Sequence, residues 1–147
     1  MAIPTKFRET LSLAYRRVSA LQRGEKRCFG VTMSQCVVLE LLLQQGSMTV
    51  REMARDLGLD TSTVTRVVDV LVRDGMARRA RDEKGDRRRV FVSLTARGCK
   101  LAARLERCAD DYSERILRRI PAEMREDVIH TLRVLIEAID DLPATCN

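Results

Sequence analysis

Residues 49–76 read TVREMARDLGLDTSTVTRVVDVLVRDGM, two short amphipathic segments separated by Gly58. Thr49 and Glu52 have the spacing of a capping box, which predicts that a helix begins there and ends at Gly58. The second segment, which Asp60 or Thr61 can cap, carries apolar residues at helical spacing on its inner face, namely Val64, Val67, Val68 and Leu71. The stretch therefore predicts two short helices joined by a tight turn.

The outer face of the second segment carries hydroxyl groups and a cation. A helix of this kind can enter the major groove of DNA, where hydroxyl groups reach phosphates and base edges and an arginine binds phosphate or guanine. Its amide-rich N-terminus also favours phosphate. The predicted DNA-binding residues of this helix are Thr61, Ser62, Thr63, Thr65 and Arg66. The alternative is an ordinary helical hairpin whose cap is rich in serine and threonine.

A basic hairpin follows directly. Between residues 76 and 89 seven Arg or Lys residues oppose three acids, and residues 90–94 alternate in polarity as in a half-buried strand. Gly85 supplies freedom for a positive φ at the tip. We expect Arg87, Arg88 and Arg89 to reach the DNA backbone or the minor groove, with Arg88 on the opposite face from the other two. A solvated charge run is the alternative that charge alone leaves open.

The two ends of the chain predict long helices. Apolar residues recur at helical spacing from Ile3 to Leu21, from Thr95 to Ile120 and from Pro121 to Leu142. Residues 24–30 interrupt the first pattern, and Thr32 with Gln35 forms another capping-box pair before a buried helix. The predicted fold is mainly α with a small β-hairpin wing, a winged helix-turn-helix with a helical dimerisation region from both chain ends.

The terminal helices predict how the chain is organised. Their apolar stripes are too long for a small DNA-binding lobe to cover, so a second copy is the simplest way to bury them. We expect a single chain, 1–147, with a DNA-binding lobe at 32–98 and a dimerisation region at 1–27 and 99–147. A twofold dimer would place its recognition helices in successive major grooves about 34–36 Å apart and favour an inverted-repeat operator. The alternative is a monomer whose terminal helices pack on their own domain.

Composition narrows the classes of function. The net charge of +6 over 147 residues favours an anionic partner, here double-stranded DNA. No leader or membrane-spanning run is evident, so we expect a cytoplasmic protein with no membrane partner. The sequence has no phosphate loop or nucleophile elbow, and its one histidine, His130, lies in an apolar helical pattern. We therefore predict no enzyme, no catalytic residue and no cofactor; a constitutive architectural DNA-binding protein and a thiol oxidoreductase are the alternatives.

Five cysteines leave two interpretations open. They lack the paired short spacings of a closed zinc site, and no metal ligand is predicted. They are either small buried hydrophobic residues or partly a sensor for an oxidant, an electrophile or a thiophilic metal ion. Cys28 is expected between the first two helices, Cys36 at the start of the second and Cys108 on a helical seam. These three are the candidate effector-sensing residues, and Lys26 and Arg27 favour Cys28 as the more reactive thiol.

Within residues 57–98, the run LDTSTVTRVVDVLVRDGMARRARDEKGDRRRVFVSLTARG resembles the MarR family of winged helix-turn-helix regulators. It matches the family's recognition helix, wing and the Leu-Thr-x-x-Gly start of the next helix, and the resemblance extends over nearly the whole chain. The resemblance implies a homodimer in which the first helix and the last two helices of each subunit interleave, and a scaffold without a catalytic site. We predict a sequence-specific repressor that an effector releases from its operator, with cysteine chemistry as one route of release.

The resemblance carries expectations for individual residues. In the family an acid of the recognition helix often pairs with a wing arginine, and the matching positions are Asp69 and Arg88. The family's effector pocket lies where the dimerisation helices meet the DNA-binding lobe, which corresponds to the segments that hold Cys28 and Cys36. Peroxide-sensing members carry a reactive cysteine early in their first helix. This chain has none there, which weakens a peroxide assignment.

Overall fold

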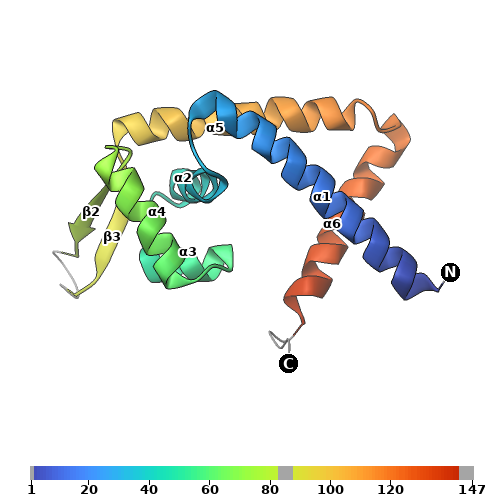
Figure 1. Ribbon diagram of the computed structural model, residues 1–147, viewed down its shortest axis with the longest axis horizontal. Coiled ribbons are helices and arrows are strands. Elements are labelled where there is room, and N and C mark those ends of the chain that lie inside the picture. Colours follow the sequence, from blue (N-terminus) through green and yellow to red (C-terminus); the bar gives the residue numbers. More distant parts are fainter. Residues whose placement is uncertain (1, 83–87, 143–147) are drawn as a thin grey trace. The chain divides into compact units, whose positions relative to one another are not determined.

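The computed structural model describes residues 2–82 and 88–142, apart from the side chains of residues 21–28 (Figure 1). The helices are α1 (Ile3–Phe29), α2 (Met33–Gln45), α3 (Val50–Leu57), α4 (Thr61–Arg73), α5 (Ala96–Leu117) and α6 (Arg125–Asp140), with a short 3-10 helix, η1 (Ala122–Met124). The strands are β1 (Ser47–Thr49), β2 (Ala77–Arg81) and β3 (Val90–Leu94). This mainly helical architecture with a small antiparallel sheet confirms the predicted winged-helix fold class.

The chain divides into two compact units, Met1–Glu106 and Arg107–Asn147. The hydrophobic core lies in the first unit, where α2 and α4 pack against each other and α3 packs on α4. The predicted inner face of α4 is confirmed, because Val64, Val68 and Leu71 are buried and Val67 is half-buried. The other large core side chains come from α2, α3 and β3, namely Val38, Leu39, Leu42, Met53 and Val92. This packing holds the outer face of α4 toward solvent.

Capping boxes begin α2 and α3, as predicted. The Thr32 amide donates to Gln35 Oε1 at 2.7 Å, and the Gln35 amide donates to Thr32 Oγ1 at 3.3 Å. In α3 the Thr49 amide donates to Glu52 Oε2 at 2.8 Å, and the Glu52 amide donates back to the Thr49 hydroxyl at 3.3 Å. Gly58 then ends α3 in the left-handed conformation, with φ 61° and ψ 33°. Both boxes satisfy amides that a helix N-terminus otherwise leaves without intrahelical partners.

The sheet has three strands in the order β1-β3-β2, and both pairs are antiparallel. Met48 of β1 and Arg79 of β2 both lie opposite Val92 of β3. The sequence predicted the hairpin of β2 and β3 but not β1, which is only three residues long. This extra strand joins the start of α3 to the root of the wing.

Helix boundaries differ from the prediction at two places. Helix α1 continues through Gly24 to Phe29 and is followed by Gly30 at φ 68°, so Cys28 lies within α1 and the expectation of a linker position was wrong. A glycine inside a helix costs only about 1 kcal/mol relative to alanine, which a long helix can absorb. At the other end, Pro121 caps η1 instead of opening a long helix, and α6 begins at Arg125.

The terminal helices carry large exposed apolar side chains. On α1 the exposed fraction reaches 85% for Ile3, and Phe7 is also exposed. In the second unit α6 has no buried residue, and Leu132 and Ile136 are exposed. None of the helices in the described residues combines the length and apolarity needed to cross a membrane.

Candidate nucleic-acid interface

The first turns of α4 present the predicted hydroxyl residues at or near the surface. Thr61 and Ser62 are exposed, and Thr63 and Thr65 are half-buried. The Thr65 hydroxyl donates to the Thr61 carbonyl at 2.7 Å, so its proton is used within the helix and its lone pairs remain for a donor. Arg66 is exposed, and within the described part of the chain no acid pairs with it. The helix therefore offers an uncompensated cation beside a hydroxyl-rich end.

The outer face of α4 is tied to the hairpin by an ion pair. Arg79 Nη2 of β2 lies 2.6 Å from Asp69 Oδ1. The family resemblance matched Asp69 with Arg88, whereas the structure pairs it with Arg79, which β2 places beside α4. On the same strand Arg78 donates from Nε to Ser93 Oγ at 3.2 Å. The hairpin is thereby fixed to the helix that carries Arg66.

The tip of the hairpin is only partly described. Gly85 and Arg87 lie outside the described residues. Arg88 and Arg89 precede β3 and are both exposed. Since neither belongs to the strand, the alternation that was expected to send Arg88 and Arg89 to opposite faces stays a prediction.

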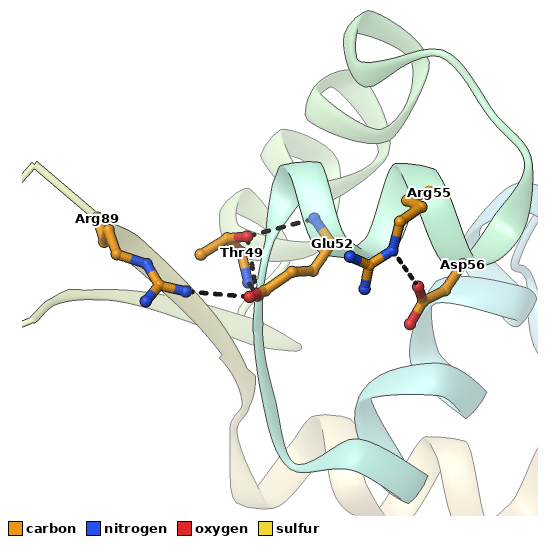
Figure 2. A network of polar contacts seen from close by, with 5 residues as sticks. All are labelled: Thr49, Glu52, Arg55, Asp56 and Arg89. Carbon is orange, nitrogen blue, oxygen red and sulfur yellow. Dashed lines mark hydrogen bonds and ion pairs between the residues drawn. The ribbon is translucent and has the colours of Figure 1, made fainter.

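Arg89 belongs to a polar network that connects three elements (Figure 2). Its Nη2 donates to Glu52 Oε1 at 3.0 Å, while the other carboxylate oxygen accepts from the Thr49 amide and hydroxyl at 2.8 and 2.9 Å. The Arg89 guanidinium carbon also lies 5.1 Å from the centroid of the Phe91 ring, in a cation–π contact. Glu52 thus joins the end of β1, the first turn of α3 and the root of the wing.

This network keeps Glu52 ionised. The hydrogen bonds from the Thr49 amide and hydroxyl, and then the charges of Arg89 and Arg55, lower the pKa of Glu52 below its ordinary value of 4.5. The sequence predicted the capping contact with Thr49 because the spacing is local. It could not predict the contact with Arg89, which lies 37 residues away.

The candidate sensing cysteines fall in different parts of the chain. Cys36 is half-buried in α2, and its thiol donates to Glu40 Oε1 at 3.3 Å. Cys108 is half-buried in α5, within the second unit, and the Cys28 side chain lies outside the described residues. Among the residues that the structure describes, no three His, Cys, Asp or Glu side chains could hold a metal ion together. His130 is exposed on α6.

Comparison with known proteins agrees with this geometry. The model of the MarR family matches residues 31–90, which extend from α2 to the start of β3. The chain is 30% identical over 111 residues to the HTH-type transcriptional regulator YfiV of Bacillus subtilis, covering 76% of this chain and 69% of YfiV. It is 28% identical over 128 residues to the HTH-type transcriptional repressor NicR of Pseudomonas putida, covering 87% of this chain and 80% of NicR.

A solved structure gives the same fold over nearly the full length. The Streptococcus pneumoniae protein FabT, in complex with DNA, superposes with a TM-score of 0.84 at 21% identity, covering 95% of this chain and 99% of FabT. The fold, the family model and the similar proteins therefore all indicate the same family. The chain belongs to the MarR family and is a DNA-binding transcriptional regulator.

Proposed function

We propose that this regulator is a repressor that binds an inverted-repeat operator as a homodimer and leaves it when an effector binds. The observation that carries the proposal is the outer face of α4, where Arg66 has no acidic partner among the described residues and follows an exposed hydroxyl-rich turn. Two similar proteins support the proposal, because NicR is named a repressor and FabT was solved in complex with DNA.

The proposed DNA contacts divide between helix and wing. Helix α4 enters the major groove, where Arg66 reads a base edge and the hydroxyl groups of its first two turns hold phosphates or base edges. These hydroxyl residues are Thr61, Ser62, Thr63 and Thr65, of which Thr65, whose proton is donated to the Thr61 carbonyl, is left to accept from a base edge. The wing holds the flanking backbone through Arg87 and Arg88, while Arg89 keeps its place at the wing root. The ion pair of Asp69 with Arg79 supports this division, because it fixes the wing relative to α4.

The proposed dimer covers the apolar faces of the terminal helices. Phe7 and Val18 on α1 are each more than half exposed, as are Leu132 and Ile136 on α6. Large exposed apolar patches on a monomer are rare and mark interaction surfaces. A second copy is the proposed partner because a twofold dimer also supplies the two α4 helices that an inverted repeat requires.

A gel-shift titration with the DNA upstream of the protein's own gene tests the proposal, with a scrambled duplex of equal length beside it. Arg66→Ala should weaken operator binding by about 1–3 kcal/mol and scrambled binding much less, if Arg66 contacts a base. Arg16→Ala, an exposed arginine on α1, is the control for the loss of one charge. Equal affinity of wild type and Arg66→Ala for the operator would contradict the proposal.

We propose further that effector release acts through thiol chemistry at Cys28, with Cys36 and Cys108 as the other candidates. The Glu40 carboxylate beside Cys36 would oppose the negative charge of a thiolate there, which leaves Cys28 as the first residue to test. A modification that costs the DNA-bound state about 1.4 kcal/mol weakens binding about tenfold.

The thiol proposal is tested with an oxidant, an electrophile and a soft metal ion in parallel gel shifts. Wild type and Cys36→Ser should leave the operator, and Cys28→Ser should stay bound. If all three proteins leave it equally, the effector acts elsewhere, and a small apolar ligand between the helices becomes the candidate.

A further inference from the structure

A positively charged crevice lies between the start of α3 and the root of the wing. It has a volume of about 590 Å³ and is lined by Thr49, Arg51, Glu52, Arg55, Arg88, Arg89 and Val90. Four arginines therefore face a single carboxylate across a space large enough for a phosphate group. None of these α3 residues was singled out as a DNA contact from the sequence.

The arginines of the crevice differ in what compensates their charge. Arg89 pairs with Glu52 at 3.0 Å, and Arg55 donates from Nε to Asp56 Oδ1 at 3.0 Å (Figure 2). Arg51, in contrast, is exposed and has no acidic partner in the part of the chain that the structure describes. Arg51 is thus the uncompensated cation of α3, as Arg66 is of α4.

The position of the crevice indicates which anion it takes. One wall is the root of the wing, and the other is α3, which packs directly on α4, so the crevice adjoins both elements proposed to bind DNA. In helix-turn-helix proteins the helix that precedes the recognition helix crosses the sugar-phosphate backbone. An arginine suits this task because its planar guanidinium binds phosphate oxygens in pairs.

The Glu52 network gives the crevice a fixed wall. The carboxylate accepts hydrogen bonds from the Thr49 amide and hydroxyl as well as from Arg89, and the Arg89 guanidinium also lies over the Phe91 ring. Both groups are therefore oriented in the free protein. A site whose wall is already ordered loses less side-chain entropy when an anion binds.

We propose that this crevice binds one backbone phosphate of the DNA duplex, with Arg51 as the phosphate ligand and Glu52 as the residue that positions Arg89 in the crevice wall. The inference rests on the proposed binding of DNA by α4 and the wing, which brings a duplex to this face. It assigns to α3 a contact that fixes the register of the protein on the backbone and reads no base.

The salt dependence of DNA binding tests the inference. Arg51→Gln should make the negative slope of log K against log salt shallower by about 0.9, which corresponds to about eightfold weaker binding at 0.1 M salt, for operator and scrambled duplex alike. Arg51→Lys should restore the slope, because it keeps the charge. Arg16→Gln on α1 makes the same charge change outside the crevice and should leave the slope at its wild-type value.

Three outcomes would overturn the inference. They are an unchanged slope in Arg51→Gln, an equal fall in Arg16→Gln, and a fall in Arg51→Lys as large as in Arg51→Gln. Failure of the base-reading proposal has a different signature, because it shows as an unchanged ratio of operator to scrambled binding in Arg66→Ala. The two failures can therefore be told apart in one set of titrations.

Discussion

Gly98 lies where the backbone of α5 meets the end of the α4–β2 connection, and its replacement by alanine should destabilise the protein. Gly98 is buried, and its amide donates to Thr95 Oγ1 at 3.1 Å. A Cβ added at Gly98 would overlap the Met76 carbonyl oxygen and lie 2.9 Å from the Met76 carbonyl carbon. Because both are backbone atoms, no rotamer change can relieve the contact.

The loss of stability in Gly98→Ala can be estimated from the hydrogen bonds that a shift of the Met76 carbonyl would disturb. The Met76 carbonyl accepts from the Thr95 amide at 3.0 Å, and the Thr95 hydroxyl donates to the Gly75 carbonyl at 2.7 Å. Loss of each bond costs about 1 kcal/mol, and overpacking adds about 1–3 kcal/mol of strain. The higher helix propensity of alanine relative to glycine stabilises the variant by at most about 1 kcal/mol. We expect Gly98→Ala to lower the free energy of unfolding by about 3 kcal/mol.

Urea unfolding followed by circular dichroism measures this change, at equal protein concentration because a dimer's stability depends on it. Cys99→Ala is the matched control, since Cys99 is the exposed neighbour of Gly98 in the same helical turn and its replacement should change stability by less than about 0.5 kcal/mol. A Gly98→Ala protein as stable as wild type, or more stable, would refute the reasoning from the Met76 contact.

Three further predictions follow from other contacts. Since the folded-state pKa of Glu52 lies below its ordinary value of 4.5, its stabilising effect is present above that pH and is lost as the pH falls through the folded-state pKa. Glu52→Gln should therefore make the melting temperature depend less on pH below 4.5. The variant should keep the capping box, because a glutamine, Gln35, fills the same position in the capping box of α2. Leu42→Ala should lower the free energy of unfolding in urea by about 2–5 kcal/mol, because the Leu42 side chain of α2 is fully buried in the core. Ile136→Glu should yield monomers in analytical ultracentrifugation with unchanged helical content, because it puts a charge on the exposed apolar face of α6, and a dimer of normal affinity would contradict that interface.

Features that depend on neighbouring residues could be predicted from the sequence. The hydroxyl of Thr49 and the carboxylate of Glu52 are three residues apart, so their spacing alone gave the start of α3. The same holds for Thr32 with Gln35 and for the valines that face inward on α4. Recognition of the wing followed from strand alternation beside a glycine.

Features that depend on distant pairing could not be predicted. Strand β1 has three residues, too few to show alternation, and exists because Met48 pairs with Val92. The partners of Asp69 and Glu52 are arginines 10 and 37 residues away, and many arginines of the hairpin compete for them on sequence grounds. Their choice is set by how the sheet packs on α3 and α4.

The bonds around Thr95 have a mechanical consequence. The Thr95 hydroxyl donates to the Gly75 carbonyl and accepts from the Gly98 amide, while Arg97 donates to the Asp74 carbonyl at 3.2 Å. These bonds fasten the first turn of α5 to the segment that follows α4. A rotation of that first turn should therefore be passed on to the recognition helix through these three hydrogen bonds.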